Sequence, residues 1–197
     1  MPKSADELKL DFCSFSCNTS PIKDIFFEEP ESIMSITVMR KVAFCAGHRL
    51  LNHEGKCANL HGHNYLVEFH ITGNEVDDLG RVVDFADIKR LFKGWIDEHW
   101  DHGTILWDAD ENALAAVEKI RPNKIYRLPY NPTAENLARY LLTQIGPQLV
   151  STIRGYDLIV SKVVVWETDN AFAEVTADIS QHQSDAMLNR VNGYKQD

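Results

Sequence analysis

Residues 61–72 read HGHNYLVEFHIT, and most of this stretch has the alternation of a β-strand. Apolar side chains recur at every second position from Tyr65 to Ile71. Successive side chains of a strand point to opposite faces of the sheet, so this pattern places the apolar side chains on one, buried face. We therefore expect a strand over residues 64–72, entered directly from His61-Gly62-His63.

The rest of the chain shows the periodicities of several more elements. Residues 33–46 are rich in β-branched and apolar side chains, which favours a first strand before the His-Gly-His stretch. The other elements that we expect are helices over 84–100, 108–119 and 132–146, and strands over 158–166 and 171–179. Consecutive strand pairs with helices between them indicate an α+β domain with an antiparallel sheet.

The chain divides into three expected segments. Residues 1–32 are polar and irregular and are interpreted as an N-terminal extension, and residues 181–197 as a polar tail. Residues 33–180 form the expected domain. A length of 197 residues is ordinary for one domain, and a hydrophobic content of 44% is enough to bury a core.

Charge and cysteine content limit the classes of function. The formal net charge of −9 argues against a nucleic-acid partner, because phosphate contacts need clustered Lys and Arg. No apolar run approaches the roughly 20 residues that cross a bilayer, and the start of the chain lacks the apolar segment of a secretory signal. We expect a cytoplasmic protein without a membrane partner. Four cysteines in a chain of this length do not suggest a disulfide framework.

Three histidines have the spacing of a metal site. His61 and His63 stand two residues apart at the entrance of a strand, so both imidazoles point to the same face, with Gly62 adding no bulk between them. His48 follows the preceding strand and reaches the other two if the strands pair. Three His ligands leave one position of a tetrahedral zinc open, which is the catalytic pattern. The alternative is three separate polar histidines.

The remaining histidines and cysteines show weaker patterns. His99 and His102 lie three residues apart at a helix end and could also chelate a metal, and Cys13 with Cys17 could do so as a pair. Cys45 is out of phase with its apolar neighbours, and we expect it to pack in the core. The histidines to which no role is assigned are His53, His70, His99 and His182.

Several motifs together resemble a known family, that of the 6-pyruvoyl-tetrahydropterin and 6-carboxy-tetrahydropterin synthases. The resemblance covers about residues 35 to 180 and keeps the family's motif order. The matching stretches are FCAGHRL at 44–50, KCANLHGH at 56–63, VDF at 83–85, DH at 101–102, PTAEN at 132–136 and WET at 166–168. Two segments depart from short members of the family, the first 32 residues and the long stretch 106–127.

The resemblance implies a tunnelling fold with a four-stranded antiparallel sheet and two helices on one face. It implies that trimers close their sheets into a barrel, that two trimers stack into a hexamer, and that the active sites lie at subunit interfaces. It also implies zinc as the cofactor, bound by His48, His61 and His63.

The resemblance further implies catalysis by Cys57, Asp101 and His102, with Glu167 as the anchor of the pterin ring. A carboxylate suits that role because it accepts hydrogen bonds from the two adjacent N–H donors of the pyrimidine edge. Thr133 and Glu135 belong to the motif that opens the second long helix, and the resemblance implies that both contact the substrate. For Glu135 a ligand contact and a favourable place at the helix N-terminus are equally good interpretations.

The implied substrate is 7,8-dihydroneopterin triphosphate. Three residues separate Cys57 from His61, a short interval that resembles the 6-carboxy-tetrahydropterin synthases of the queuosine (7-deazaguanine) pathway, which release acetaldehyde and triphosphate. The alternative is a 6-pyruvoyl-tetrahydropterin synthase, in which this interval is usually longer. A pterin- or metal-binding protein without catalysis is the third hypothesis, against which the thiol and the Asp-His pair argue.

Overall fold

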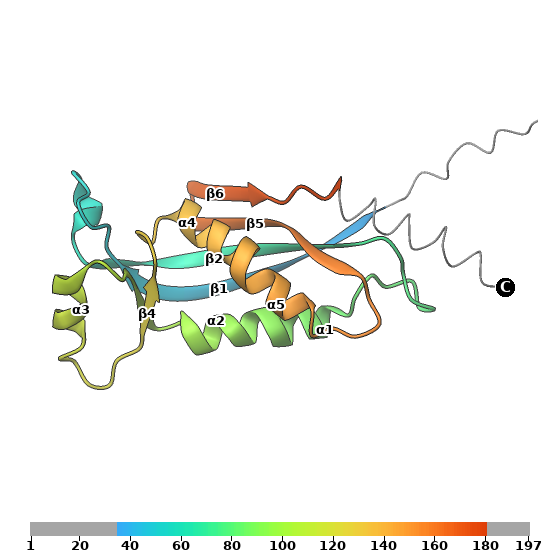
Figure 1. Cartoon of the computed structure of the whole chain (residues 1–197), viewed down its shortest axis with the longest axis horizontal. Helices are drawn as coiled ribbons and strands as arrows, with labels where there is room; N and C mark the ends of the chain where they lie inside the picture. The colour runs from blue at the N-terminus through green and yellow to red at the C-terminus, as the bar shows by residue number, and fades with distance from the viewer. Residues whose placement is uncertain (1–34, 181–197) are drawn as a thin grey trace, which may run out of the picture. The chain divides into compact units, whose positions relative to one another are not determined.

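The computed structural model describes residues 35–180. In this part of the chain six strands form one sheet in the order β4-β3-β1-β2-β5-β6 (Figure 1). The strands are β1 (Ile36–His48), β2 (His61–Gly73), β3 (Gly103–Trp107), β4 (Ile125–Leu128), β5 (Leu158–Thr168) and β6 (Ala171–Thr176). The expected extension, 1–32, and the expected tail, 181–197, lie outside the described residues, as do Cys13, Cys17 and His182.

Four of these strands are the ones that the sequence predicts, and they pair antiparallel. β1 and β2 pair along their whole lengths, with His48 opposite His61 and Ile36 opposite Gly73. β2 pairs with β5, and β5 with β6. The long β1–β2 ladder brings the end of the first strand to the start of the second, where the predicted metal ligands stand.

The expectation of a four-stranded, wholly antiparallel sheet is wrong. β3 pairs parallel with the last residues of β1, and β4 pairs parallel with β3. These two strands have only five and four residues, too few for a clear alternation. Tertiary contacts hold them instead, among them the hydrogen bond from the His102 backbone N–H to the Cys45 carbonyl at 2.7 Å.

Two helical rods cover one face of the sheet, as expected (Figure 1). Each is an α-helix with one wider turn of π type in its middle. The first comprises α1 (Phe85–Ile88), η2 (Lys89–Lys93) and α2 (Gly94–His99), and the second α4 (Ala134–Tyr140), η3 (Leu141–Ile145) and α5 (Gly146–Val150). The second rod passes the expected end at 146, and Pro147 lies in the first turn of α5, directly after the wider turn.

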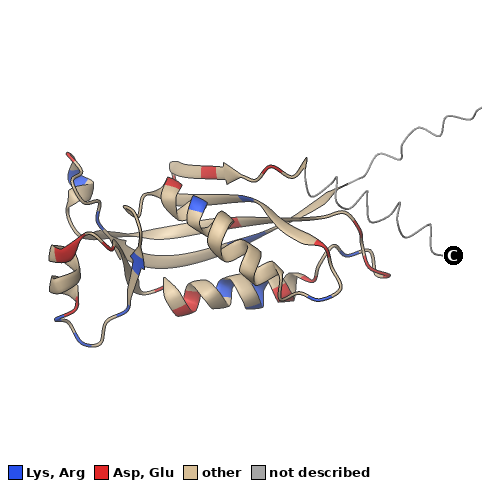
Figure 2. Ribbon diagram, viewed as in Figure 1, with Lys and Arg blue, Asp and Glu red and all other residues tan. Residues whose placement is uncertain are grey.

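The core lies between the rods and the sheet. Alternate side chains of β2, such as Val67 and Phe69, are buried together with Phe92 of the first rod and Leu137 of the second. On its outer side the first rod carries both charges, basic residues in the middle and acidic ones nearer the ends (Figure 2). None of the described helices is both long and apolar enough to span a bilayer.

The long segment between the two rods forms a small unit of its own. It comprises β3, α3 (Glu111–Val117) and β4, and it has a separate apolar cluster around Leu106 and Leu114. Asp110 caps α3 by accepting a hydrogen bond from the Ala113 N–H at 3.1 Å. The other carboxylate oxygen of the buried Asp110 pairs with Arg49 Nε at 2.8 Å, which ties this unit to the residue after His48.

Candidate metal centre

Three imidazoles meet at the paired ends of β1 and β2. His48, His61 and His63 each offer a ring nitrogen, and these atoms lie within 4.8 Å of one another. His48 is fully buried and the other two are half-buried. A side chain at Gly62 would come within 2.9 Å of the Ala46 carbonyl oxygen, so only glycine lets the strands pair this closely between the two ligands.

Backbone carbonyls decide which ring nitrogens face inward. His48 Nδ1 lies 2.9 Å from the Pro132 carbonyl oxygen, and His61 Nδ1 lies 2.7 Å from that of Asn59. Since a carbonyl only accepts, both Nδ1 atoms carry the proton, and both Nε2 atoms keep their lone pairs. Those two Nε2 atoms are 3.2 Å apart. Two lone pairs facing each other at that distance repel, and a cation bound between them would remove this repulsion.

The arrangement fits a metal ion. With metal–nitrogen bonds of about 2.0–2.1 Å, two ligands of a tetrahedral zinc are roughly 3.3 Å apart, close to the observed separation of the two Nε2 atoms. His63 Nε2 is buried and has no hydrogen-bond partner among residues 35–180, so it too is available as a ligand. The expectation that these three residues can hold a metal is therefore supported by the structure.

Burial keeps His48 in the form that binds metal. Its pKa is lowered to about 4, mainly by desolvation and to a smaller extent by His61 and His63, against the opposing effect of the Pro132 carbonyl. At neutral pH the imidazole is therefore uncharged, with one lone pair free.

Glu167, at the end of β5, reaches the same place. Its carboxylate oxygen lies 3.6 Å from His48 Nε2 and 3.8 Å from His63 Nε2, and its side chain is 25% exposed. These distances exceed a hydrogen bond, so the carboxylate stands beside the imidazoles with room for another group to contact it.

Tyr65 is a residue of this site that the motifs did not predict. Its ring lies edge-on to His48 and His63, with centroids 5.9 and 5.5 Å away. Burial, and then the negative charges of Glu167 and Cys57, raise the pKa of its phenol above the ordinary value. The alternation that places Tyr65 on the face of His61 and His63 was the available signal, because a hydroxyl at a core position needs a partner.

Cys57 lies in the short helix η1 (Lys56–Ala58), in the loop between β1 and β2. Its carbonyl accepts a hydrogen bond from the Leu50 N–H at 2.8 Å, which closes this loop against the end of β1. The thiol is half-buried. The structure thus places the predicted thiol in the loop that leads from His48 to His61.

Asp101 and His102 are held together but in a different place. Asp101 accepts hydrogen bonds from the Cys45 N–H at 2.9 Å and from His102 Nδ1 at 2.8 Å. Burial opposes ionisation of Asp101, yet these two bonds outweigh it and keep the pKa of the carboxyl below its ordinary value. The His102 side chain is 80% exposed, which leaves its other nitrogen open to a ligand.

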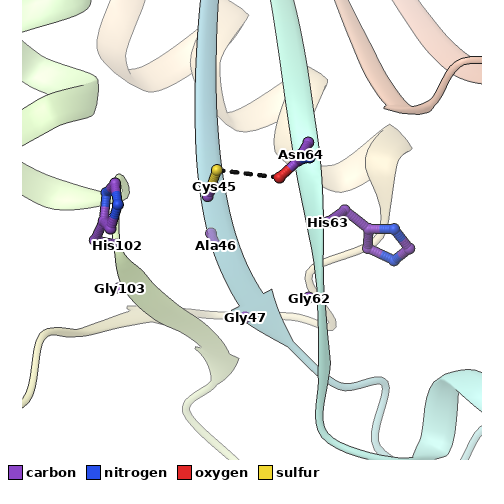
Figure 3. Close-up of a pocket in the computed structure, with 8 residues that line it drawn as sticks. All are labelled: Cys45, Ala46, Gly47, Gly62, His63, Asn64, His102 and Gly103. Atoms are coloured by element: carbon purple, nitrogen blue, oxygen red, sulfur yellow. Dashed lines mark hydrogen bonds between the residues drawn. The ribbon is translucent and has the colours of Figure 1, made fainter.

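An open cavity of about 390 Å³ is lined by His102 and by residues of β1 and β2, among them His63 (Figure 3). Figure 3 shows His102 on one side of the β1–β2 pair and the His63 ring on the other. Cys45 and Asn64 line the cavity, and the Cys45 thiol donates to Asn64 Oδ1 at 3.1 Å. The expectation that Cys45 packs in the core is wrong, since a residue out of phase with a buried face points to the other face.

The remaining predicted residues have structural contacts. Thr133 caps α4, its hydroxyl accepting a hydrogen bond from the Asn136 N–H at 3.3 Å, and Glu135 is exposed in the first turn. His99 packs its ring on Trp95, with centroids 4.8 Å apart. Among residues 35–180, the His48 group is the only set of three or more potential ligands, and the rival His99–His102 pair, with two ligands, stays a prediction.

A comparison with protein families identifies the chain. The family model for 6-pyruvoyl tetrahydropterin synthase matches residues 37–178, which include every site residue discussed above. The chain belongs to this family. Membership confirms the resemblance found in the motifs. The site therefore belongs to a family of tetrahydropterin synthases.

Curated relatives in this family are named 6-carboxy-5,6,7,8-tetrahydropterin synthase. The Rickettsia bellii protein is 42% identical over 140 residues, which cover 71% of this chain and 99% of the relative. The Haemophilus influenzae protein is 29% identical over 142 residues, which cover 70% and 96% of the two chains.

Solved structures support the fold. A protein of uncharacterised function from Wolinella succinogenes is 23% identical with a TM-score of 0.61, the match covering 74% of this chain and 99% of that one. The 6-pyruvoyl tetrahydropterin synthase of Plasmodium falciparum is 24% identical with a TM-score of 0.55, covering 73% and 98%. The α+β tunnelling fold is therefore confirmed, with six strands in place of four.

Proposed function

We propose that this chain is a 6-carboxy-5,6,7,8-tetrahydropterin synthase, which converts 7,8-dihydroneopterin triphosphate to 6-carboxy-tetrahydropterin with release of acetaldehyde and triphosphate. The observation that carries the proposal is the set of Rickettsia relatives of that name, which are between 41% and 43% identical and are matched over 99% of their lengths. The short interval between Cys57 and His61 agrees with it. The reaction would supply the queuosine pathway.

The three imidazoles would hold zinc, the metal that best suits three neutral nitrogen ligands with a fourth position open. Bound there, zinc would stabilise negative charge on an oxygen of the substrate side chain. The contribution of the chain is to set the geometry: the Pro132 and Asn59 carbonyls fix the tautomers of His48 and His61, as second-shell partners of metal sites do.

Cys57 would be the base that removes a carbon-bound proton from the substrate side chain. Its place in η1, four residues before His61 in the loop between the two ligand-bearing strands, supports a thiol that acts near the metal site and is not part of the ligand group. A protein that only bound pterin would need no such thiol, which disfavours the non-catalytic alternative.

Asp101 and His102 would exchange the second proton, the carboxylate orienting the imidazole through the 2.8 Å bond to Nδ1. Because His102 stands across the β1–β2 pair from His63 in the same chain (Figure 3), we place this pair in the site of a neighbouring copy. Assembly into a trimer or hexamer would then complete each site, and this would account for an exposed His102 at a cavity edge, held by Asp101.

Glu167→Gln is expected to weaken pterin binding by about 1.5–3 kcal/mol, since a charge-assisted bidentate contact to the two N–H donors is lost. Zinc content should stay unchanged. Titration of the zinc-loaded protein with a reduced pterin measures the effect. The matched control is Glu174→Gln. Glu174 is an exposed carboxylate on β6 that pairs with Lys162 of β5. Equal affinity in the Glu167 variant and the unaltered protein would exclude the anchoring role.

The product distinguishes the two synthase activities. We expect acetaldehyde to appear in step with consumption of 7,8-dihydroneopterin triphosphate in a coupled dehydrogenase assay, and mass spectrometry to find 6-carboxy-tetrahydropterin. The position of the thiol relative to the metal decides which bond breaks, and a misplacement of about 1 Å can change a rate by a factor of 100. The pyruvoyl compound without acetaldehyde would instead establish the alternative.

A further inference from the structure

The tautomer of His48 depends on where one carbonyl group lies. Its Nδ1 is 2.9 Å from the carbonyl oxygen of Pro132, a residue between β4 and α4, outside both elements. If Nδ1 lost this acceptor, the proton could move to Nε2, since a neutral imidazole has one proton for two nitrogens. Nε2 would then donate to His61 Nε2, 3.2 Å away, and a hydrogen bond would take the place of the metal. The position of the Pro132 carbonyl therefore decides whether His48 and His61 form a metal site.

The side chain of Asn131 fastens the segment of this carbonyl to the chain just after β1. Its Oδ1 accepts a hydrogen bond from the Leu51 N–H at 2.7 Å, and its Nδ2 donates to the Leu51 carbonyl oxygen at 3.0 Å. The amide thus pairs with one residue through both of its polar ends, as a neighbouring strand would. Leu51 follows His48 by three residues, so this clamp joins the segment of the ligand to the segment of its acceptor.

The backbone of Asn131 is held as well. Its carbonyl accepts hydrogen bonds from the Thr133 N–H and from the side-chain amide of Asn136, both at 2.9 Å. Thr133 is the cap of α4, and Asn136 lies in its first turn. The ring of Pro132 restricts its φ to about −65°, which leaves its carbonyl little freedom once both neighbours are fixed. Asn131 therefore sets the place of this carbonyl through its side chain and its backbone together.

Burial makes the His48 bond more sensitive than the clamp itself. His48 is fully buried and Pro132 is buried, so solvent has no direct access to Nδ1 as a substitute acceptor. Asn131 and Leu51 are half-buried, so water can replace the bonds of the clamp when the side chain is removed. The expected effect of its loss is therefore a displaced carbonyl rather than an unfolded domain.

We propose that Asn131 is a positioning residue for the metal ligand His48. It holds the Pro132 carbonyl where Nδ1 needs an acceptor, and so keeps the lone pair of Nε2 directed at the metal. The inference rests on the part of the proposed function in which the three imidazoles bind zinc. Asn131 acts through the carbonyl and is assigned no contact with the metal or the substrate.

The test compares Asn131→Ala with the unaltered protein. In metal-free protein at neutral pH, a long-range ¹H–¹⁵N NMR spectrum reports the tautomer of His48, whose signals are assigned by their absence in His48→Gln. The unaltered protein should carry the proton on Nδ1, and the variant should show a second form with the proton on Nε2. Chelator competition should find the zinc affinity of the variant about 10- to 100-fold lower, the loss expected for an indirect partner of a metal ligand.

Asn123→Ala is the matched control. The Asn123 amide also donates to backbone carbonyls, that of Ile120 at 2.9 Å and that of Val117 at 3.3 Å, but in the unit formed by β3, α3 and β4. This variant should lose some thermal stability and keep both the His48 tautomer and the zinc affinity.

Asn131→Asp is the second variant, and it decides the question if the alanine variant does not fold. It keeps the acceptor for the Leu51 N–H and loses the donor to the Leu51 carbonyl. It should therefore show both changes of the alanine variant, in the tautomer and in the zinc affinity, to a smaller extent.

A purely structural role would lower the melting temperature of these Asn131 variants and leave the His48 tautomer and the zinc affinity unchanged, and that result would overturn the assignment. So would an unaltered metal-free protein in which His48 carries its proton on Nε2. If the unaltered protein has the proton on Nδ1 but binds no zinc, the proposed metal centre fails, and the role of Asn131 toward a metal fails with it.

Discussion

His61→Ala is expected to leave the purified protein with little bound metal. The substitution removes one of three imidazoles whose ligand atoms lie within 4.8 Å of one another, and two imidazoles with water bind zinc poorly. Loss of an indirect partner of a metal ligand already costs about 10- to 100-fold in affinity, so loss of the ligand itself should cost about 100-fold or more. Metal analysis and competition with a chelator measure this.

The matched control is His53→Ala. His53 lies in the same β1–β2 loop, is exposed, and accepts a hydrogen bond from the Gly55 N–H at 2.8 Å. It should keep about one zinc per chain. A His61→Ala protein that still binds about one zinc per chain would contradict the assignment of the metal centre.

Cys57→Ala is expected to abolish measurable turnover while zinc content and pterin binding persist. General base catalysis contributes about 10²- to 10⁴-fold, and alanine offers no group that replaces the thiol. Zinc should remain because Cys57 is not part of the three-residue ligand group. Initial rates with 7,8-dihydroneopterin triphosphate, measured together with metal content, separate the chemical step from binding.

Cys13→Ala is the control for loss of a thiol that has no role in catalysis. Cys13 lies outside residues 37–178, the part of the chain that matches the family model. It should leave the rate unchanged. Near-normal turnover by the Cys57 variant would refute the role of this thiol, and it would leave the metal centre as a separate finding.

The ligand set could be predicted because it depends on local geometry. Side chains alternate along a strand, so His61 and His63 share a face wherever the strand lies, and a hairpin-like pairing brings His48 opposite. The same rule, applied wrongly, placed Cys45 in the core. Its neighbours Phe44 and Ala46 are the buried ones, and Cys45 therefore faces the cavity on the other side.

The short strands and the place of the Asp-His pair could not be predicted in this way. β3 and β4 form because backbone groups of 103–107 and 125–128 pair with segments far along the chain. A run of four or five residues shows too little alternation to predict a strand from the sequence. Asp101 and His102 follow a helix in the sequence, and only the pairing of β3 with β1 puts them across the sheet from the metal ligands.

The sequence by itself determined the fold class, the family and the identity of the ligand-bearing residues, because alternation and motif spacing are properties of neighbouring residues. Only the tertiary structure decided the six-stranded order, the separation of His102 from His63, and the burial of Tyr65 against the rings of His48 and His63. The physical reason is that hydrogen bonding and burial of a group depend on what packs against it, and those partners come from segments far apart in the chain.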